Sequence, residues 1–348
     1  MSKVGFGIIG CGVIAPIHAD ALSRIPDAKL VAVSDAVEKN VNAMAEKYGA
    51  VPYTDMHEML KRDDVHAVSL CVPSGMRLEM AEACVAAGKH IIAEKPLEVN
   101  CERIDRLIAA VDKAGVRLAS IFQYRYADGP MHIRRALDEG RFGKLVLGDA
   151  YIKWYRSQEY YDSGKWRGTR KLDGGGALMN QGIHQIDMLL WFMGNAKSVT
   201  AQTALVGHTG IEVEDLAVAM IQFENGAMGV IEGSTAIWPG HPARVEVHGT
   251  NGSAVIEDGE LAMWKFQEER SEDESILKSL DKGETLGSGA SDPIKSLKSE
   301  GHRRQLADFV ESLLANRPAK IDGREGRKAV ELIEAIYSSA ETGKTVTL

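Results

Sequence analysis

A glycine-rich turn near the N-terminus constrains the fold of this chain more than any other feature. Gly10, Gly12 and Ala15 follow the pattern GxGxxA, directly after the apolar run Val4–Ile9 and at the start of the apolar-periodic stretch Ala15–Ile25. A strand, a tight glycine turn and a helix in this order are typical of a dinucleotide-binding fold, in which the helix N-terminus faces a diphosphate. The pattern therefore predicts a parallel sheet with helices on both faces.

Each residue of the turn has a distinct expected role. Gly10 permits the tight turn, Gly12 lets a diphosphate approach the backbone, and Ala15 keeps the helix close to the strand. Val13 and Ile14 complete the loop. These five residues are the first candidate cofactor contacts.

Asp35 adds a second cofactor signal. It follows the next expected strand, Leu30–Ser34, where its carboxylate would accept hydrogen bonds from both hydroxyls of the adenosine ribose. A 2′-phosphate would meet a like charge there, and Ala36 and Val37 supply no guanidinium, so the sequence favours NAD over NADP. The alternative is a glycine turn in another kind of α/β protein.

Strands and helices alternate along the chain as far as Gln123. This alternation predicts a doubly wound parallel sheet, so we expect residues 1–122 to form a Rossmann domain. The expected strands after the first are Leu30–Ser34, Ala67–Val72, His90–Ala93 and Val116–Phe122, and the expected helices are Ala15–Ile25, Val37–Tyr48, Met76–Ala87 and Cys101–Ala114.

The pattern changes beyond residue 123. Two helical stretches, Ala127–Glu139 and Ala177–Phe192, lead into alternating apolar segments separated by Asn225-Gly226, Asn251-Gly252 and Asp258-Gly259. Because such pairs supply the positive φ of tight hairpins, residues 123–348 are expected to form an α+β domain with a large, mainly antiparallel open sheet. One face of that sheet could pair with another subunit, giving a homodimer or homotetramer.

The last part of the chain divides into a polar stretch and two helices. Glu268–Glu300 is rich in charge, glycine and serine and is expected to be a mobile excursion. The helices Arg303–Leu314 and Gly326–Ala340 are expected to close the second domain.

A lysine marks the end of one strand of the expected parallel sheet. Glu94-Lys95-Pro96 follows the strand His90–Ala93, at the sheet edge where open α/β sheets bind ligands. Because Pro96 disfavours helical backbone at Lys95, the lysine side chain need not lie along a helix. Its ammonium group could hydrogen-bond a substrate hydroxyl and ease removal of the proton. The alternative is a surface lysine at a strand end.

A histidine lies within the first helix that follows three consecutive glycines. Asn180, His184 and Asp187 are spaced i, i+4, i+7, which predicts one shared helical face. An imidazole titrates near neutral pH and can take up a hydroxyl proton while a hydride leaves carbon. The alternative is a buried histidine satisfied by a backbone carbonyl. No second ligand pair accompanies His184 and Asp187, so no metal is expected.

Composition narrows the class of partner. Lys and Arg number 41 against 49 Asp and Glu, and the resulting charge of −8 disfavours nucleic acid or an anionic membrane as a partner. No apolar run reaches about 20 residues and no export leader is apparent, so neither a membrane span nor secretion is expected. The 4 cysteines lack metal-ligand spacing and are typical of a reducing, cytoplasmic compartment.

Taken in order, these motifs resemble the GFO/IDH/MocA family of NAD(P)-dependent oxidoreductases, which includes glucose–fructose oxidoreductase and inositol dehydrogenase. The resemblance covers nearly the whole chain, including the closing stretch Asp322–Arg327. It implies a Rossmann domain, a second domain whose open sheet usually mediates oligomerisation, and substrates among sugars, sugar derivatives and cyclitols. It also implies hydride transfer between NAD and a secondary hydroxyl.

The resemblance assigns residues as well. Lys95 matches the family's catalytic lysine and His184 its active-site histidine, while many members carry Asp where this chain has Asn180. Because an amide cannot take up the proton, we expect His184 to be the base, Lys95 to polarise the hydroxyl and Asn180 to position the substrate. The further matches to cofactor-lining positions are Pro73, Ser74, Glu94, Lys95 and Gln123, with Trp166 and Arg167 from the second domain.

The stretch Lys153–Arg170 is dense in Trp, Tyr and Arg. Aromatic planes can stack on sugar faces, and guanidinium groups can hold hydroxyls, carboxylates or phosphates. We therefore expect a substrate-pocket wall with Tyr155 and Arg156 as substrate contacts. The alternative is a strand followed by a surface loop.

Three classes of function remain open. The first is a dehydrogenase or reductase that releases its cofactor in each cycle. The second is a redox-neutral enzyme with tightly bound NAD, such as an epimerase, a paired oxidoreductase or an NAD-dependent glycosidase, because this fold supports all of these reactions. The third is a non-catalytic NAD-binding sensor, against which Lys95 and His184 together argue.

Overall fold

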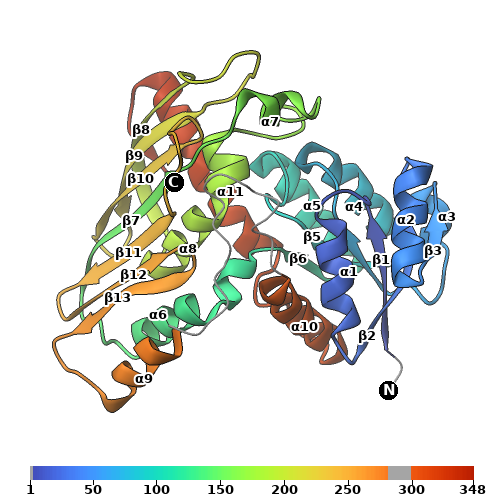
Figure 1. Ribbon diagram of the computed structural model, residues 1–348, viewed down its shortest axis with the longest axis horizontal. Coiled ribbons are helices and arrows are strands. Elements are labelled where there is room, and N and C mark those ends of the chain that lie inside the picture. Colours follow the sequence, from blue (N-terminus) through green and yellow to red (C-terminus); the bar gives the residue numbers. More distant parts are fainter. Residues whose placement is uncertain (1–2, 281–298) are drawn as a thin grey trace. The chain divides into compact units, whose positions relative to one another are not determined.

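The computed structural model describes residues 3–280 and 299–348, which fall into two compact units (Figure 1). The first unit comprises residues 3–123 and 299–327, and the second comprises residues 124–280 and 328–348. Among the described residues, no helix is long and apolar enough to cross a membrane.

The first unit contains the expected parallel sheet. Its 6 strands lie in the order β3-β2-β1-β4-β5-β6, and every neighbouring pair is parallel. The order reverses between β1 and β4, and open α/β sheets bind ligands at such a switch point, beyond the carboxyl ends of the strands. The elements are β1 (Val4–Ile9), α1 (Ala15–Ser23), β2 (Ala28–Ser34), α2 (Glu38–Tyr48), β3 (Val51–Tyr53), α3 (Met56–Leu60), β4 (Ala67–Leu70), α4 (Arg77–Ala86), β5 (His90–Ala93), α5 (Cys101–Ala114), β6 (Leu118–Ser120) and α10 (Glu300–Leu314).

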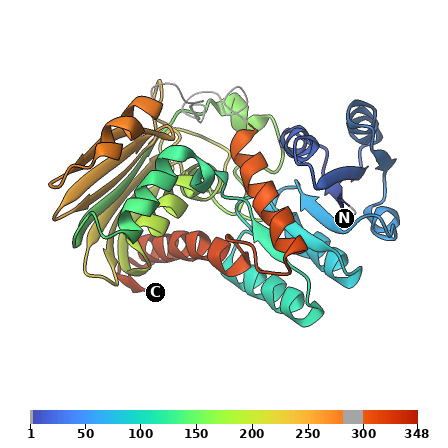
Figure 2. The same ribbon diagram turned by 90° about the horizontal axis from the view of Figure 1, so that it is seen from below.

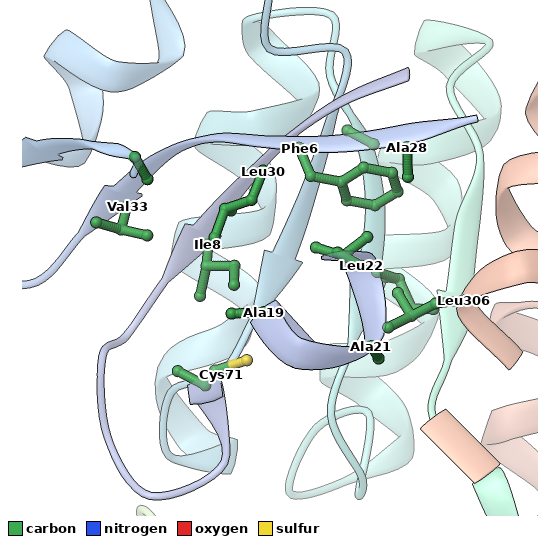
Figure 3. Packing of buried hydrophobic residues seen from close by; sticks show 14 of the residues in the cluster. Phe6, Ile8, Ala19, Ala21, Leu22, Ala28, Leu30, Val33, Cys71 and Leu306 are labelled. Carbon is green, nitrogen blue, oxygen red and sulfur yellow. The ribbon is translucent and has the colours of Figure 1, made fainter. Parts of the chain in front are cut away.

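The helix α10 belongs to this first unit, although the sequence predicted that all residues after 122 form the second domain. Its apolar face completes the core around the sheet: Phe309 packs edge-on against Phe6 of β1 with ring centroids 6.4 Å apart. Leu306 is fully buried in the same cluster with Leu22 of α1 (Figure 3). The helical periodicity of the sequence predicted the apolar face of α10, but it could not predict which of the two sheets this face covers.

The second unit contains a sheet of 8 strands in the order β13-β12-β11-β7-β10-β9-β8-β14. All neighbouring pairs are antiparallel except β7 and β10, which are parallel. The strands are β7 (Leu145–Lys153), β8 (Ala196–Ala204), β9 (Leu216–Phe223), β10 (Met228–Ser234), β11 (Arg244–Gly249), β12 (Gly252–Glu257), β13 (Glu260–Phe266) and β14 (Val346–Thr347). The expected mainly antiparallel sheet is confirmed.

Helices cover one face of this sheet. Figures 1 and 2 show α6 (Asp128–Asp138) and α8 (Ile183–Met193) lying against it, and burial alternates along β9, with every second side chain exposed. The remaining helices are α7 (Gln158–Asp162), α9 (Ser271–Leu280) and α11 (Gly323–Thr342), the last of which continues from the first unit into the second.

All three predicted hairpin turns are present, but for two different reasons. Gly226 (φ +87°) and the pair Asp258 (φ +46°) and Gly259 (φ +88°) supply the positive φ that tight turns need. Gly252 instead begins β12, and a Cβ atom there would overlap the ring of Phe266. At Asn251-Gly252 the glycine therefore serves close packing.

The polar stretch Glu268–Glu300 is only partly described. Its first part forms the helix α9, where a mobile excursion was expected, and Asp273 there accepts hydrogen bonds from Arg141 (2.8 Å) and from the indole of Trp264 (2.8 Å). These contacts hold α9 against β13. Residues 281–298 lie outside the described part of the chain.

Candidate active site

Hydrogen bonds to the Asp35 side chain fix the conformation of the glycine turn after β1. The Asp35 carboxylate accepts the backbone N–H of Cys11 (2.7 Å) on one oxygen and that of Val37 (2.8 Å) on the other. Gly10 has φ +90°, and a Cβ there would lie 2.8 Å from the carbonyl oxygen of Cys71. Asp35 therefore shapes the turn, in addition to the expected role toward ribose hydroxyls.

The same turn leaves room for a dinucleotide. A Cβ on Gly12 would meet no atom within 4 Å, and Val13 is 57% exposed. Ala15 is fully buried at the start of α1, and Ile14 precedes it as the N-cap residue. An open backbone at a helix N-terminus fits the diphosphate of NAD, because the unpaired N–H groups there favour an anion.

Arg77 ties together the loops that follow β4 and β5. Its guanidinium donates to the carbonyl oxygens of Val72 (3.1 Å), Glu94 (2.7 Å) and Pro96. The predicted residues of these loops thus share one edge of the sheet: Pro73 and the buried Ser74 follow β4, and Lys95 follows β5, in a cis peptide with Pro96.

Glu94 and Gln123 are both buried in the first unit. The Glu94 carboxylate accepts hydrogen bonds from His18 (2.9 Å) and His302 (3.1 Å) and from the backbone N–H of Lys95 (3.1 Å). Gln123 packs against Gly301, where a Cβ would lie 3.0 Å from the Gln123 carbonyl oxygen. The sequence interpretation had both residues lining the cofactor; the structure places the Glu94 side chain in a buried polar cluster with His18 and His302.

Three consecutive glycines allow close packing before the helix of the second unit. A Cβ on Gly175 would overlap the hydroxyl of Tyr337, and one on Gly176 would overlap the carbonyl oxygen of Glu214. The partly buried Glu214 carboxylate accepts hydrogen bonds from the backbone N–H groups of Gly176 (3.0 Å) and Leu178 (2.9 Å) and from the hydroxyl of Tyr337 (2.8 Å). Burial raises the pKa of Glu214, and these donors oppose that effect.

The predicted continuous helix Ala177–Phe192 is wrong in its first part. Ala177–Gly182 forms a π-helical segment, in which the N–H of Gln181 reaches the carbonyl oxygen of Gly176, and α8 starts only at Ile183. Because a π-turn is wider than an α-turn, Asn180 does not share one regular helical face with His184 and Asp187.

His184 is buried and lies flat on an aromatic neighbour. Its ring stacks on Tyr124 with centroids 4.5 Å apart and an interplanar angle of 16°. Burial raises the pKa of Tyr124 to about 12, so the phenol stays neutral. The stack fixes the plane of the imidazole, and Tyr124 is a residue that the sequence interpretation missed; the polar and aromatic run 123–126 after a buried strand was the available signal.

Asp187 is engaged by a buried arginine. Its two carboxylate oxygens accept a bidentate pair of hydrogen bonds from Arg125 (2.6 and 2.7 Å), and Arg125 also lies over the ring of Trp191. The carboxylate therefore anchors α8 next to Tyr124.

Asn180 has a carboxylate for a neighbour. Its side-chain N–H group donates to Asp173, whose other oxygen accepts the backbone N–H of Gly168 (2.8 Å). Asp173 is buried, and its place directly before the three glycines was not recognised from the sequence. The Asp173 carboxylate therefore lies next to Asn180, the position where many relatives were expected to carry Asp. It contacts the candidate site through the Asn180 amide.

The aromatic and basic stretch forms one connected wall in the second unit. Gln181 links Arg156 (Nε to Oε1, 2.9 Å) with Asn180 (3.2 Å) and the hydroxyl of Tyr160 (2.9 Å). The guanidinium of Arg167 lies 4.2 Å from the Tyr160 ring centroid. Gln181 and Tyr160, which the sequence interpretation left out, thus hold three predicted residues together.

The remaining predicted members of the wall contact this group through Arg156 and Arg167. Trp166 packs under Arg167 at 4.7 Å, and Tyr155 meets the ring of Trp238 edge-on at 5.0 Å. Trp238 is 75% exposed, whereas Arg156 is 2% exposed. Arg156 therefore lies inside the wall, and Trp238 presents an exposed aromatic surface.

Comparison with known proteins gives consistent matches over both units. The model of an oxidoreductase family with an NAD-binding Rossmann fold matches residues 4–122, and that of a GFO/IDH/MocA C-terminal domain matches residues 131–255. Among curated proteins, the chain is 29% identical to myo-inositol 2-dehydrogenase of Thermotoga maritima over 98% of each chain. It is 27% identical to D-glucoside 3-dehydrogenase of Escherichia coli over 100% of this chain and 98% of that protein.

Solved structures agree with the curated relatives. The WlbA dehydrogenase of Bordetella pertussis, solved in complex with NADH and UDP-GlcNAcA, superposes with a TM-score of 0.91 at 32% identity. The match covers 100% of this chain and 98% of that one.

Proposed function

Because the chain belongs to the GFO/IDH/MocA family of NAD-binding oxidoreductases, we propose that it transfers hydride between NAD and a secondary hydroxyl of a sugar, a sugar derivative or a cyclitol. The open backbone at Gly12, above the carboxyl ends of β1 and β4, is the observation that carries cofactor binding. The curated and solved relatives named above act on cyclitols or glucosides or bind a nucleotide sugar, which supports this substrate class.

The experiment that tests this function is a substrate panel. Sugars, cyclitols, glycosides and nucleotide sugars are each incubated with NAD, and NADH formation is followed at about 340 nm. We expect turnover with at least one polyhydroxylated substrate. Absence of turnover across the panel would favour an NAD-binding sensor, and cofactor absorbance that survives gel filtration would favour a redox-neutral enzyme.

The residues of the chain divide the chemistry among them. When bound, NAD supplies the hydride acceptor. We assign removal of the hydroxyl proton to His184, whose ring plane is fixed by Tyr124, and stabilisation of the developing alkoxide to the ammonium group of Lys95. Asn180, held by Asp173 and Gln181, orients the substrate by hydrogen bonding.

Asn180 fits its surroundings better than an aspartate would. A carboxylate at this position would face the buried carboxylate of Asp173, and two adjacent carboxylates cannot both ionise at low cost. The amide donates to Asp173 instead. We therefore assign the proton-transfer role to His184 alone.

Substitution of Gly12 separates cofactor binding from folding. In Gly12→Ala the added methyl group meets no protein atom, so we expect unchanged thermal stability. It would, however, occupy the space of the diphosphate and weaken NAD binding by about 10- to 100-fold, or roughly 1.4–2.8 kcal/mol. Fluorescence titration with NADH and thermal unfolding measure the two effects.

Gly10→Ala is the matched control for this prediction. Its methyl group would lie 2.7 Å from Val72 Cγ1 at a φ of +90°, so we expect losses of both stability and affinity. Unchanged NADH affinity in Gly12→Ala would contradict the assignment of the turn.

We further propose that a second copy of the chain covers the exposed face of the eight-stranded sheet. Met220 of β9, Met228 of β10 and Leu147 of β7 are all exposed there, and Met228 is paired with Leu147 in the β7–β10 register. An apolar patch of this kind on a sheet is typical of an interface.

The four cysteines are free thiols, which is consistent with a cytoplasmic location.

The proposed oligomer can be tested by introducing charged side chains on the exposed face of the sheet. We expect the wild-type protein to be a dimer or tetramer by light scattering at micromolar concentration, and Met220→Asp combined with Met228→Asp to lower the mass to that of a monomer, since paired burial of two carboxylates is costly. Leu314→Asp, at an exposed position of α10 in the first unit, is the control. A monomeric wild type would refute the proposal.

A further inference from the structure

A buried polar cluster lies beneath the loop that carries Lys95. His18 of α1, Glu94 after β5 and His302 of α10 are 0%, 5% and 1% exposed. Glu94 Oε1 accepts a hydrogen bond from each imidazole, at 2.9 Å from His18 Nε2 and 3.1 Å from His302 Nε2. The two imidazole rings pack edge-on against each other. Three elements that are distant in sequence therefore converge on a single carboxylate oxygen.

The hydrogen bonds define the protonation state of the cluster. Burial alone would raise the pKa of Glu94, but the hydrogen bonds from His18 and His302 overcome this and hold its pKa well below the ordinary value. Burial lowers the pKa of His18, so that ring is neutral. The Ser69 hydroxyl, 2.6 Å from His18 Nδ1, then donates to it, which leaves Nε2–H to point at Glu94.

The second oxygen of this carboxylate reaches Lys95. Glu94 Oε2 accepts the backbone N–H of Lys95 (3.1 Å), while Arg77 holds the carbonyl groups of Glu94 and Pro96 on either side. The direction in which Lys95 leaves the sheet edge is thus fixed by a carboxylate whose own orientation depends on two imidazoles.

We propose that His302 and His18 are positioning residues for Lys95, acting through Glu94. His302 follows Glu94 by 208 residues and is brought to it by α10, whose apolar face is anchored on β1 through Phe309 and Phe6. The C-terminal part of the chain thereby contributes to the placement of the ammonium group of the first unit. This inference rests on the proposed function, in which Lys95 acts on the substrate hydroxyl.

The same three side chains could in principle hold a cation. The ligand atoms of His18, Glu94 and His302 lie within 4.8 Å of one another. In the hydrogen-bonded arrangement, however, both Nε2 atoms act as N–H donors to the carboxylate, which satisfies its charge without an ion. A metal bound at one ion per chain would overturn the proposal.

The test compares His302→Gln with His302→Leu. Glutamine keeps an N–H donor near the position of Nε2, whereas leucine has a comparable volume and no donor. We expect His302→Leu to lower kcat by about 10- to 100-fold, the range typical for loss of an orienting partner. We expect the KM for NAD to stay within twofold, and His302→Gln to recover most of the kcat. His57→Leu, at an exposed position of α3, is the control.

Hydrogen exchange provides a readout that does not depend on activity. Exchange at the Lys95 amide should accelerate at least tenfold in His302→Leu and return toward the wild-type rate in His302→Gln. A wild type without activity on any substrate, but with this exchange pattern, would refute the proposed function and leave the positioning network standing.

Three outcomes would refute the positioning role. They are a kcat of His302→Leu within twofold of the wild type, equal damage in His302→Gln and His302→Leu, and one bound metal ion per chain by elemental analysis. If His302→Leu does not fold, Ser69→Ala replaces it, since this change removes the hydroxyl that orients His18. Wild-type kcat and wild-type exchange in Ser69→Ala would then refute the role.

Discussion

Replacement of Lys95 by methionine is expected to lower kcat by about 10²- to 10³-fold, or roughly 2.7–4 kcal/mol of transition-state stabilisation. Methionine keeps most of the length and apolar volume of the side chain but removes the charge that would stabilise the alkoxide. The Lys95 N–H bond to Glu94 and the Arg77 bonds to the neighbouring carbonyl groups involve backbone atoms, so the loop should persist. Steady-state kinetics on the best substrate of the panel measures the effect.

The measurements on Lys95→Met must separate catalysis from binding. We expect the dissociation constant for NADH and the midpoint of thermal unfolding to remain close to those of the wild type, because the glycine turn and Asp35 are untouched. Lys113→Met, at an exposed position in the last turn of α5, serves as the control. A kcat within threefold of the wild type would remove Lys95 from the mechanism.

The parts of the fold that follow local rules could be predicted from the sequence. The glycine turn, the alternation of strands and helices and the Asp-Gly hairpin each depend on the backbone preferences of a few neighbouring residues. The expected helix Ala177–Phe192 is a segment that local rules predict only in part. Its first turns are π-helical, in a segment where Glu214 and Tyr337 pack against the glycines from distant parts of the chain.

In the candidate site, too, residues in local motifs could be predicted, whereas their contacts from distant parts of the chain could not. Lys95 and His184 were recognisable because each lies in a motif, whereas the residues that hold them in place were not. Tyr124 stacks on His184 across 60 residues of sequence, and His302 reaches Glu94 across 208. A histidine near the start of an amphipathic helix carries no local sign of its partner, so contacts of this kind require the three-dimensional structure.

The second large effect is expected at His184. In His184→Phe an aromatic ring that can pack on Tyr124 is kept and the two ring nitrogens are lost, so we expect the wall and α8 to fold as in the wild type. Loss of a general base typically costs about 10²- to 10⁴-fold in kcat. His132→Phe on α6 is the control.

Rescue distinguishes proton transfer from packing at this position. In His184→Ala the cavity left by the ring should admit free imidazole, and added imidazole should raise kcat in proportion to its neutral form, as expected for a mobile base. Asp173 already accepts a hydrogen bond from the side chain of Asn180, and we assign it no proton-transfer role. Activity of His184→Phe near the wild-type level would therefore require a proton acceptor outside the described network and would refute the proposed base.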